Sequence, residues 1–154
     1  MSVILKKAGT ADIQTVWEMQ KNAFQGLLDK YRDYDTNPAC ESIERLTEKF
    51  GYDDRTFYFI TDNNVNVGVV CVVCPADGSP KRISPLFIMP DYRRKGYAEA
   101  GVRETERLYG ADNWSLATIL QEEGNIRLYE KLGYHRVGET KQINDRMDLV
   151  FFEK

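Results

Sequence analysis

The first third of the chain begins with a strand pattern and continues with a helical one. Val3–Lys7 predicts a short strand. Thr10 is suited to cap a helix, and Pro38 to begin a second helix that ends before Gly51. The turn-forming stretch from Arg32 to Pro38 predicts a loop between them. The residues at helical spacing are Ile13, Val16, Trp17 and Phe24 in the first helix and Ile43, Leu46 and Phe50 in the second, while Leu27, Leu28 and Tyr31 either extend the first helix or begin a short separate one.

The middle of the chain is β-branched and aromatic. Thr56–Thr61 and Val65–Cys74 predict two strands, joined as a hairpin through Asp62-Asn63-Asn64. Lys81–Met89 predicts a third strand. Pro85 lies inside it, and because proline has no N–H to donate, we expect an edge or an irregularity there.

The last third alternates strands and helices. The predicted elements are a helix at Tyr97–Tyr109, a strand at Trp114–Leu120, a helix at Asn125–Leu132 capped by Asn125 and ended by Gly133, and strands at Tyr134–Gly138 and Met147–Glu153. The order β-α-α-β-β-β-α-β-α-β-β predicts an α/β fold with a mixed, mostly antiparallel central sheet and helices on both faces. Crossovers at 81–120 and 114–138 predict locally parallel pairing.

Composition narrows the class of protein. The 154 residues fit a single domain over 1–154, and 42% hydrophobic with 29% charged residues excludes a disordered or fibrous chain. A formal net charge of −3 argues against nucleic-acid and anionic-membrane partners, and no apolar run approaches the roughly 18 residues of a membrane span. An N-terminus without signal-peptide features and only three cysteines fit a reducing, cytoplasmic location.

The most informative segment follows the strand that ends at Met89. A short basic turn, Arg93-Arg94-Lys95, leads through Gly96 into a helix that begins at Tyr97. Amide groups at a helix N-terminus bind anions, and the glycine lets the backbone approach a phosphate closely. The competing interpretation is a solvated basic turn. The glycine patterns of nucleotide P-loops and dinucleotide-binding turns are missing.

Two motifs in this order resemble the Gcn5-related N-acetyltransferases (GNAT). The segment 93–98, Arg-Arg-Lys-Gly-Tyr-Ala, matches the family's Arg/Gln-x-x-Gly-x-Gly/Ala motif. Downstream, Asn125 precedes Tyr129 by four residues, and the segment ends in Leu132-Gly133-Tyr134, like the family's second hallmark. The resemblance extends over residues 55–154, whereas the first 54 residues match only in pattern. It implies a GNAT-like acyl-CoA N-acyltransferase fold and acetyl-CoA as cosubstrate.

The resemblance also implies roles for individual residues. The backbone of Arg93, Arg94, Lys95, Gly96, Tyr97 and Ala98 would hold the pyrophosphate of acetyl-CoA. Ile88 and Met89 would offer backbone groups to the pantetheine arm, and an N–H there could polarise the thioester carbonyl. The Asn125 side chain would bind the cofactor's arm, and Tyr129 would donate a proton to the departing thiolate.

General chemistry supports a tyrosine acid and requires a base. A tyrosine with a pKa of about 10 is protonated at neutral pH and can donate. The alternative for Tyr129 is a core aromatic residue. Glu122, just after the strand 114–120, is the candidate base, against the alternative of an ordinary surface carboxylate. The loop Tyr31–Asn37 either contacts the acceptor or is a solvated turn.

The cysteines and the histidine do not indicate a metal site. Cys71 and Cys74 are three apart in a strand and point to opposite faces, which favours packing over a disulfide or metal binding. Cys40 lies at a predicted helix start without a nearby histidine, and His135 is the only histidine of the chain. We therefore expect no metal cofactor.

The sequence leads to an enzyme hypothesis with two alternatives. The hypothesis is direct acetyl transfer from acetyl-CoA to a primary amine of a small molecule or peptide, in a ternary complex with Tyr129 as general acid. The alternatives are a non-catalytic acyl-CoA-binding module and a protein-interaction domain. The acidic pI of about 5.3 favours a cationic acceptor. Many relatives form dimers, so the C-terminal strands are a candidate homodimer contact.

Overall fold

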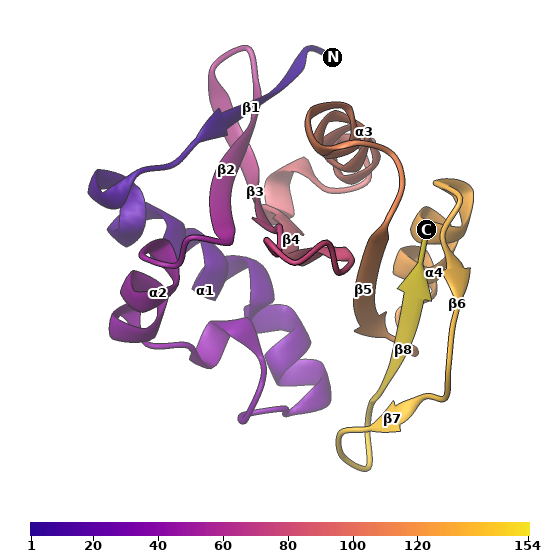
Figure 1. Ribbon diagram of the computed structural model, residues 1–154. Coiled ribbons are helices and arrows are strands. Elements are labelled where there is room, and N and C mark those ends of the chain that lie inside the picture. The colour runs from indigo at the N-terminus through magenta and orange to yellow at the C-terminus, as the bar shows by residue number, and fades with distance from the viewer.

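The computed structural model describes residues 1–154 and has an eight-stranded mixed sheet at its centre (Figure 1). The strand order is β1-β2-β3-β4-β5-β8-β6, with β7 paired to β8, and only β4 and β5 run parallel. The fold class predicted from the sequence is confirmed. The strands are β1 Val3–Lys7, β2 Arg55–Asp62, β3 Val65–Val73, β4 Lys81–Ile88, β5 Trp114–Ile119, β6 His135–Arg136, β7 Lys141–Gln142 and β8 Asp148–Glu153, and the helices are α1 Ile13–Tyr31, α2 Ile43–Phe50, α3 Tyr97–Tyr109 and α4 Glu123–Lys131.

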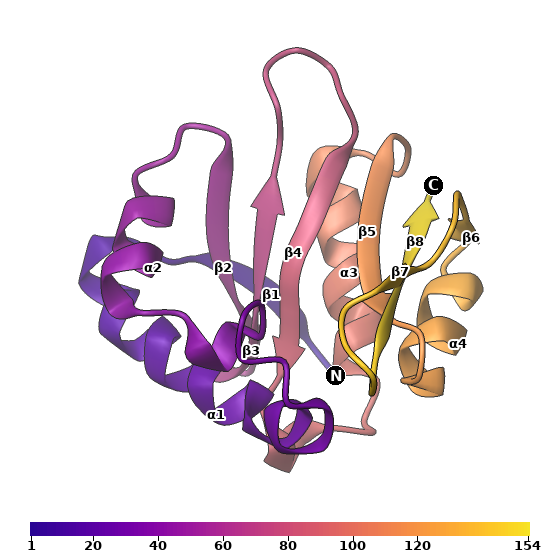
Figure 2. The same ribbon diagram turned by 90° about the horizontal axis from the view of Figure 1, so that it is seen from below.

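Alternation along the strands builds one core on each face of the sheet. In β3, Val69 and Cys71 pack with α1 and α2, whereas Val70 and Val72 belong to the cluster on the face of α3 and α4. Helices α1 and α2 cover the β1–β4 part of their face, and the β5–β8 part beside them carries no helix (Figure 2). The part of this face formed by β5–β8 therefore has no layer of helices over it.

A distortion in β4 opens the sheet. The register between β3 and β4 shifts between Val70 and Val72, opposite Ser84 and Pro85. The proline therefore lies at an irregularity, as its sequence position predicted, and such bulges bend a strand. The parallel pairing of β4 with β5 covers only two positions, Lys81 with Trp114 and Arg82 with Ser115. Beyond these positions the two strands separate and leave facing edges unpaired.

Three predicted helix starts are wrong, and in each case a different residue occupies the N-cap position. A 3-10 turn precedes α1, and its Gly9 N–H donates to the Asp12 carboxylate over 2.9 Å, so Thr10 is not the cap. Pro38 begins a separate 3-10 turn, and α2 starts after Ser42, whose hydroxyl accepts from Arg45 N–H at 3.1 Å. Helix α4 starts after Glu122, one turn before the predicted cap at Asn125.

The C-terminal strands differ from the prediction in pairing. The crossover 81–120 does give parallel pairing, but the crossover 114–138 does not, because β8 inserts between β5 and β6 and pairs antiparallel with both. The predicted strand Tyr134–Gly138 shortens to β6, and β7 was not predicted. The position beside β5 is taken by β8, the last strand of the chain. The local sequence pattern of residues 114–138 does not indicate this, because it contains no information about β8.

The cysteines and the histidine, which the sequence did not link to a metal site, are placed as follows. Cys71 is buried and Cys74 exposed, and both thiols are free. Burial raises the pKa of the Cys71 thiol to about 12. His135 begins β6 on the surface. No group of three or more His, Cys, Asp or Glu side chains is placed to hold a metal ion, and none of the helices is long and apolar enough to cross a membrane.

Candidate functional site

The separated edge of β4 presents free backbone donors. Met89 donates its N–H to the Val67 carbonyl at 2.8 Å, and its own carbonyl accepts from Tyr92 N–H at 2.9 Å. Because N–H groups alternate between the two edges of an antiparallel strand, the N–H groups of Leu86 and Ile88 point away from β3 and toward β5. Strand β5 does not pair with β4 at this level. The donors available to a ligand are therefore Leu86 and Ile88, and not Met89.

The N-terminus of α3 offers a second set of free donors. The first backbone hydrogen bond of the helix runs from Ala100 N–H to the Gly96 carbonyl at 3.1 Å, so the amides of Tyr97, Ala98 and Glu99 precede it and have no acceptor in the protein. Gly96 has φ 86°, a left-handed conformation that glycine adopts without strain. Arg94 and Lys95 are exposed beside it. Together these groups form a candidate anion site.

The side chain of Arg93 turns away from this anion site. Its Nε donates to the Ile88 carbonyl at 3.0 Å, and its Nη2 donates to the Ala23 carbonyl of α1 at 2.6 Å. The guanidinium thus joins the end of β4 to α1. Arg93 can serve an anion through its backbone position and its charge, while its hydrogen bonds hold the turn in place.

Helix α4 places two polar side chains on the face that packs against the sheet. Asn125 donates from Nδ2 to Thr118 Oγ1 of β5 at 3.2 Å, instead of capping its own helix. Tyr129, one turn later, is 8% exposed, and its ring packs 5.7 Å from that of Tyr134 and 6.3 Å from that of Phe152. Its hydroxyl has no hydrogen-bond partner in the protein. Burial raises the pKa of Tyr129 to about 12, so the phenol keeps its proton across the physiological range.

Glu122 connects α1 to the start of α4. Its Oε2 accepts a hydrogen bond from the Tyr31 hydroxyl at 2.5 Å and from Lys30 Nζ at 2.9 Å. The Tyr31 carbonyl in turn accepts from Asn144 Nδ2 at 2.9 Å, so the β7–β8 connection joins the same network. Partial burial of the Glu122 carboxyl opposes ionisation, but the hydrogen bonds from Lys30 and Tyr31 outweigh it and lower its pKa. Glu122 is therefore an ionised carboxylate at neutral pH.

This network predicts a pH-dependent contribution to stability. Because the folded-state pKa of Glu122 is lowered, the contribution is complete above the unfolded value of about 4.3 and is lost as pH falls through the folded value. We expect Glu122→Gln to lower the melting temperature at pH 7, and the difference from wild type to shrink in melts below pH of about 4. Glu130→Gln, which removes a carboxylate without ion-pair partners from the same helix, is the control. A difference that stays constant with pH would contradict this interpretation.

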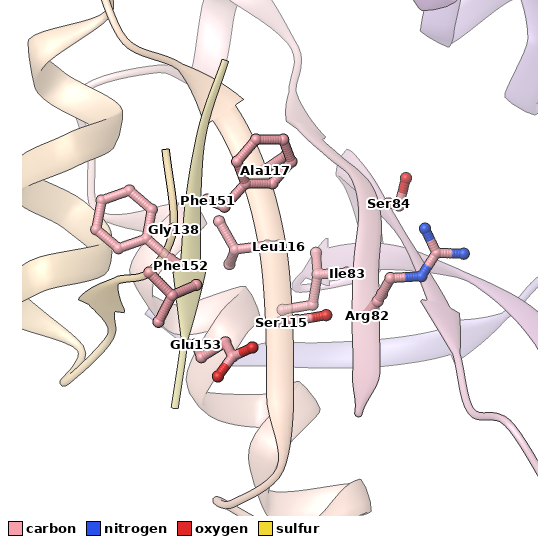
Figure 3. A pocket seen from close by; sticks show the side chains of 11 residues that line it. Arg82, Ile83, Ser84, Ser115, Leu116, Ala117, Gly138, Phe151, Phe152 and Glu153 are labelled. Atoms are coloured by element: carbon pink, nitrogen blue, oxygen red, sulfur yellow. The ribbon is translucent and has the colours of Figure 1, made fainter. Parts of the chain in front are cut away.

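Two pockets adjoin the opening on the face that carries α1 and α2. The larger, of about 620 Å³, is built by β4, β5, β8 and the segment after β6 (Figure 3). The smaller, of about 450 Å³, lies between α1, α2 and the loop after α1, and the two pockets share Ser84. Asp35 lines the smaller pocket, whereas Asp33 is buried and accepts hydrogen bonds from the Thr36 N–H and hydroxyl. Part of the loop Tyr31–Asn37 therefore faces a cavity, and part is a structural turn.

Sequence reasoning missed two residues of this region. Leu86 was overlooked because the side of a strand on which an N–H lies depends on register with β3, and the bulge at Pro85 makes that register irregular. Tyr31 was expected to extend the first helix or to belong to a short separate one, and it ends α1 with its side chain buried. Its contact with Glu122 was not predicted, because the two residues are far apart in the sequence.

Comparison with solved structures supports the fold. Spermidine N-acetyltransferase from Vibrio cholerae, in complex with CoA and spermine, is 17% identical with a TM-score of 0.76, covering 97% of this chain and 93% of that one. PaiA N-acetyltransferase from Thermoplasma acidophilum, in complex with coenzyme A, is 16% identical with a TM-score of 0.72 and full coverage of both chains. The ribosomal-protein-S18-alanine N-acetyltransferase of Escherichia coli is 14% identical with a TM-score of 0.73, covering 98% and 92%. A search of curated proteins finds no significant match.

The family assignment comes from the sequence itself. The model of the acetyltransferase (GNAT) family matches residues 15–134, from the first turn of α1 to the end of the Leu132-Gly133-Tyr134 segment. The match includes both motifs, and it reaches further toward the N-terminus than the resemblance seen by motif alone. A match over this share of the chain, on a fold that separates β4 from β5, establishes that the chain belongs to the acetyltransferase (GNAT) family.

Proposed function

We propose that this protein transfers the acetyl group of acetyl-CoA directly to a primary amine, with cosubstrate and acceptor bound together in a ternary complex. The observation that carries the proposal is the pair of free-donor sets at the end of β4, the N–H groups of Leu86 and Ile88 and the amides at the start of α3. The two sets of donors lie on either side of one short turn. Acetyl-CoA carries its thioester and its pyrophosphate at two points of one flexible arm, so it requires two sets of donors arranged in this way.

The residues present fit acetyl-CoA. The amides 97–99, the glycine at 96 and the charges of Arg94 and Lys95 suit a pyrophosphate. The free N–H groups on β4 suit the amide carbonyls of the arm, and the one nearest the thioester would stabilise its oxygen as negative charge develops there. Asn125 lies on α4 across the opening and could exchange its hydrogen bond with Thr118 for one to the arm. When bound, acetyl-CoA supplies the activated acetyl group.

Tyr129 is proposed as the general acid. The acceptor nitrogen forms a bond to the acetyl carbon, the carbon–sulfur bond breaks, and the sulfur takes up a proton while the amine loses one. A buried phenol without a protein partner is suited to donate to that sulfur. Its raised pKa keeps the O–H present, so the donor does not depend on pH in the physiological range.

Glu122 is proposed to assist deprotonation of the acceptor. An amine resembling lysine has a pKa of about 10.4 and must lose a proton before it attacks. With a lowered pKa, Glu122 is too weak a base to hold that proton, so its part is to orient a water or the ammonium by hydrogen bonding while the proton passes to solvent. Tyr31 and Lys30 hold the carboxylate in place for this task.

The direct test is acetyl transfer by the purified protein. We expect incubation with acetyl-CoA and a panel of alkylamines, diamines and amino acids to release free thiol above the rate without amine. The acetylated amine should appear in equal amount by mass spectrometry. The structural neighbour named for spermidine acts on a small polyamine, which supports small amines as the panel. If acetyl-CoA binds but no amine increases thiol release, the non-catalytic acyl-CoA-binding alternative replaces this proposal.

A further inference from the structure

Three polar side chains without partners gather where β4 and β5 begin to separate. Arg82 and Ser115 are the last paired positions, and Ser84 follows one step further along β4. Figure 3 shows Arg82 and Ser84 on one side of β4, with Ile83 on the other. All three side chains line the larger pocket, and none of them makes a hydrogen bond or ion pair within the protein.

Arg82 differs from the other cations near the two pockets. Arg45 is paired with Glu48 at 2.9 Å, and Lys49 is paired with Glu41. Arg82 has no carboxylate partner. The nearest acid along the same row of the sheet is Glu153, which pairs in register with Ser115 and therefore lies two strands away, roughly 9.6 Å at the backbone. An unpaired guanidinium next to two free hydroxyls is a site for a planar anion.

Apart from Glu153, the rest of the larger pocket is apolar, and the pocket has the size of a small molecule. Ala117, Val137 and Phe151 line the side of the pocket that is formed by β5, β8 and the segment after β6. The volume of about 620 Å³ falls in the usual range of small-ligand sites. Along β4, the free N–H of Leu86 lies four residues from Arg82, roughly 13 Å. Leu86 does not line the pocket itself, so a molecule held at Arg82 has to extend past Ser84, along β4, to bring its other end to the proposed site of acetyl transfer.

We propose that the acceptor is a small amine that carries a carboxylate at the end opposite its amino group. The carboxylate binds the Arg82 guanidinium and the hydroxyls of Ser84 and Ser115, an aliphatic or aromatic body lies against Phe151, and the amine reaches toward Leu86. This inference rests on the proposed acetyl transfer and specifies its acceptor. It reverses the expectation of a cationic acceptor from the acidic pI, because the charge nearest the bound molecule, and not the net charge, decides which group binds.

The test compares acceptors that differ only at the far end. ω-Amino carboxylates of four to eight carbons, the alkylamines of the same length and the matching diamines are assayed with acetyl-CoA by thiol release. We expect wild type to prefer the amino carboxylates in kcat/KM. Arg82→Met should lower kcat/KM for them by about 10- to 100-fold, mainly through KM, the size of a lost charge-assisted contact. The alkylamines should change by less than about twofold, since they make no such contact.

A control substitution away from the pocket should not alter the preference for amino carboxylates. Arg136→Met removes an exposed strand arginine beside Phe152, on the other face of the sheet, and should leave the preference unchanged. Equal or better transfer to alkylamines or diamines, or an unaltered preference in Arg82→Met, would overturn the inference while transfer itself stands. If no amine is acetylated, calorimetric binding of the same amino carboxylates to the CoA-loaded protein decides. Binding lost in Arg82→Met supports the anion site, and absent binding in wild type overturns it.

Discussion

Replacing Gly96 with Glu is expected to abolish the thermal stabilisation that acetyl-CoA gives to the wild-type protein. At ligand concentrations a hundredfold above Kd, binding adds about 2.7 kcal/mol to the free energy of unfolding, about 5–10 °C for a chain of this length. The variant places a negative charge and a side chain among the free amides that begin α3. Repulsion of the pyrophosphate should remove the shift, as measured by thermal melts with and without acetyl-CoA.

The matched control is Gly78→Glu. Gly78 has φ 82° and Gly96 has φ 86°, so both substitutions impose similar backbone strain, but Gly78 lies in the β3–β4 turn at the other end of β4. Both variants should melt below wild type without ligand, and only Gly78→Glu should keep the ligand-induced shift. A full shift in Gly96→Glu would show that the pyrophosphate binds elsewhere. No shift in wild type would argue against acetyl-CoA as cosubstrate.

Replacing Tyr129 with Phe is expected to lower kcat by about 10²- to 10⁴-fold, the usual contribution of a positioned general acid. The ring keeps its packing against Tyr134 and Phe152, so the fold should persist. The acetyl-CoA-induced shift in melting temperature should also persist, because Tyr129 is not part of the anion site at α3. Because the pKa of Tyr129 is raised to about 12, loss of its proton should not limit kcat between pH 6 and 10 in wild type.

Tyr134→Phe is the control for loss of a hydroxyl from the same core. Its ring lies 5.7 Å from that of Tyr129, and its hydroxyl donates to Glu106 Oε2 at 3.1 Å, away from the opening. We expect it to reduce stability, because Glu106 loses a buried partner, and to leave kcat within a few-fold. Full turnover in Tyr129→Phe would remove the proposed role of Tyr129. An equal loss of kcat in both variants would point to disturbed packing instead.

The sequence determined the features that depend on neighbours along the chain. The bounds of α3, the left-handed Gly133 and the two-residue turn at Asn63-Asn64 are as predicted or nearly so. Each depends on contacts within four residues, such as helical spacing or the freedom of Gly and Asn to adopt positive φ. The two motifs at 93–98 and 125–134 also indicated the family without any knowledge of the sheet.

The tertiary structure decided what each of these segments faces. The register of β4 with β3 leaves the N–H groups of Leu86 and Ile88 free, whereas the N–H of Met89 is bonded to the Val67 carbonyl. Asn125 was predicted to cap its helix, but its side chain donates a hydrogen bond to Thr118 of β5 instead. Glu122 meets Lys30 and Tyr31 across some ninety positions of sequence. Such partners follow from strand order, above all from β8 entering between β5 and β6, and from where β4 bends. Local sequence encodes an element's form, whereas its partners depend on how all the elements close around a common core.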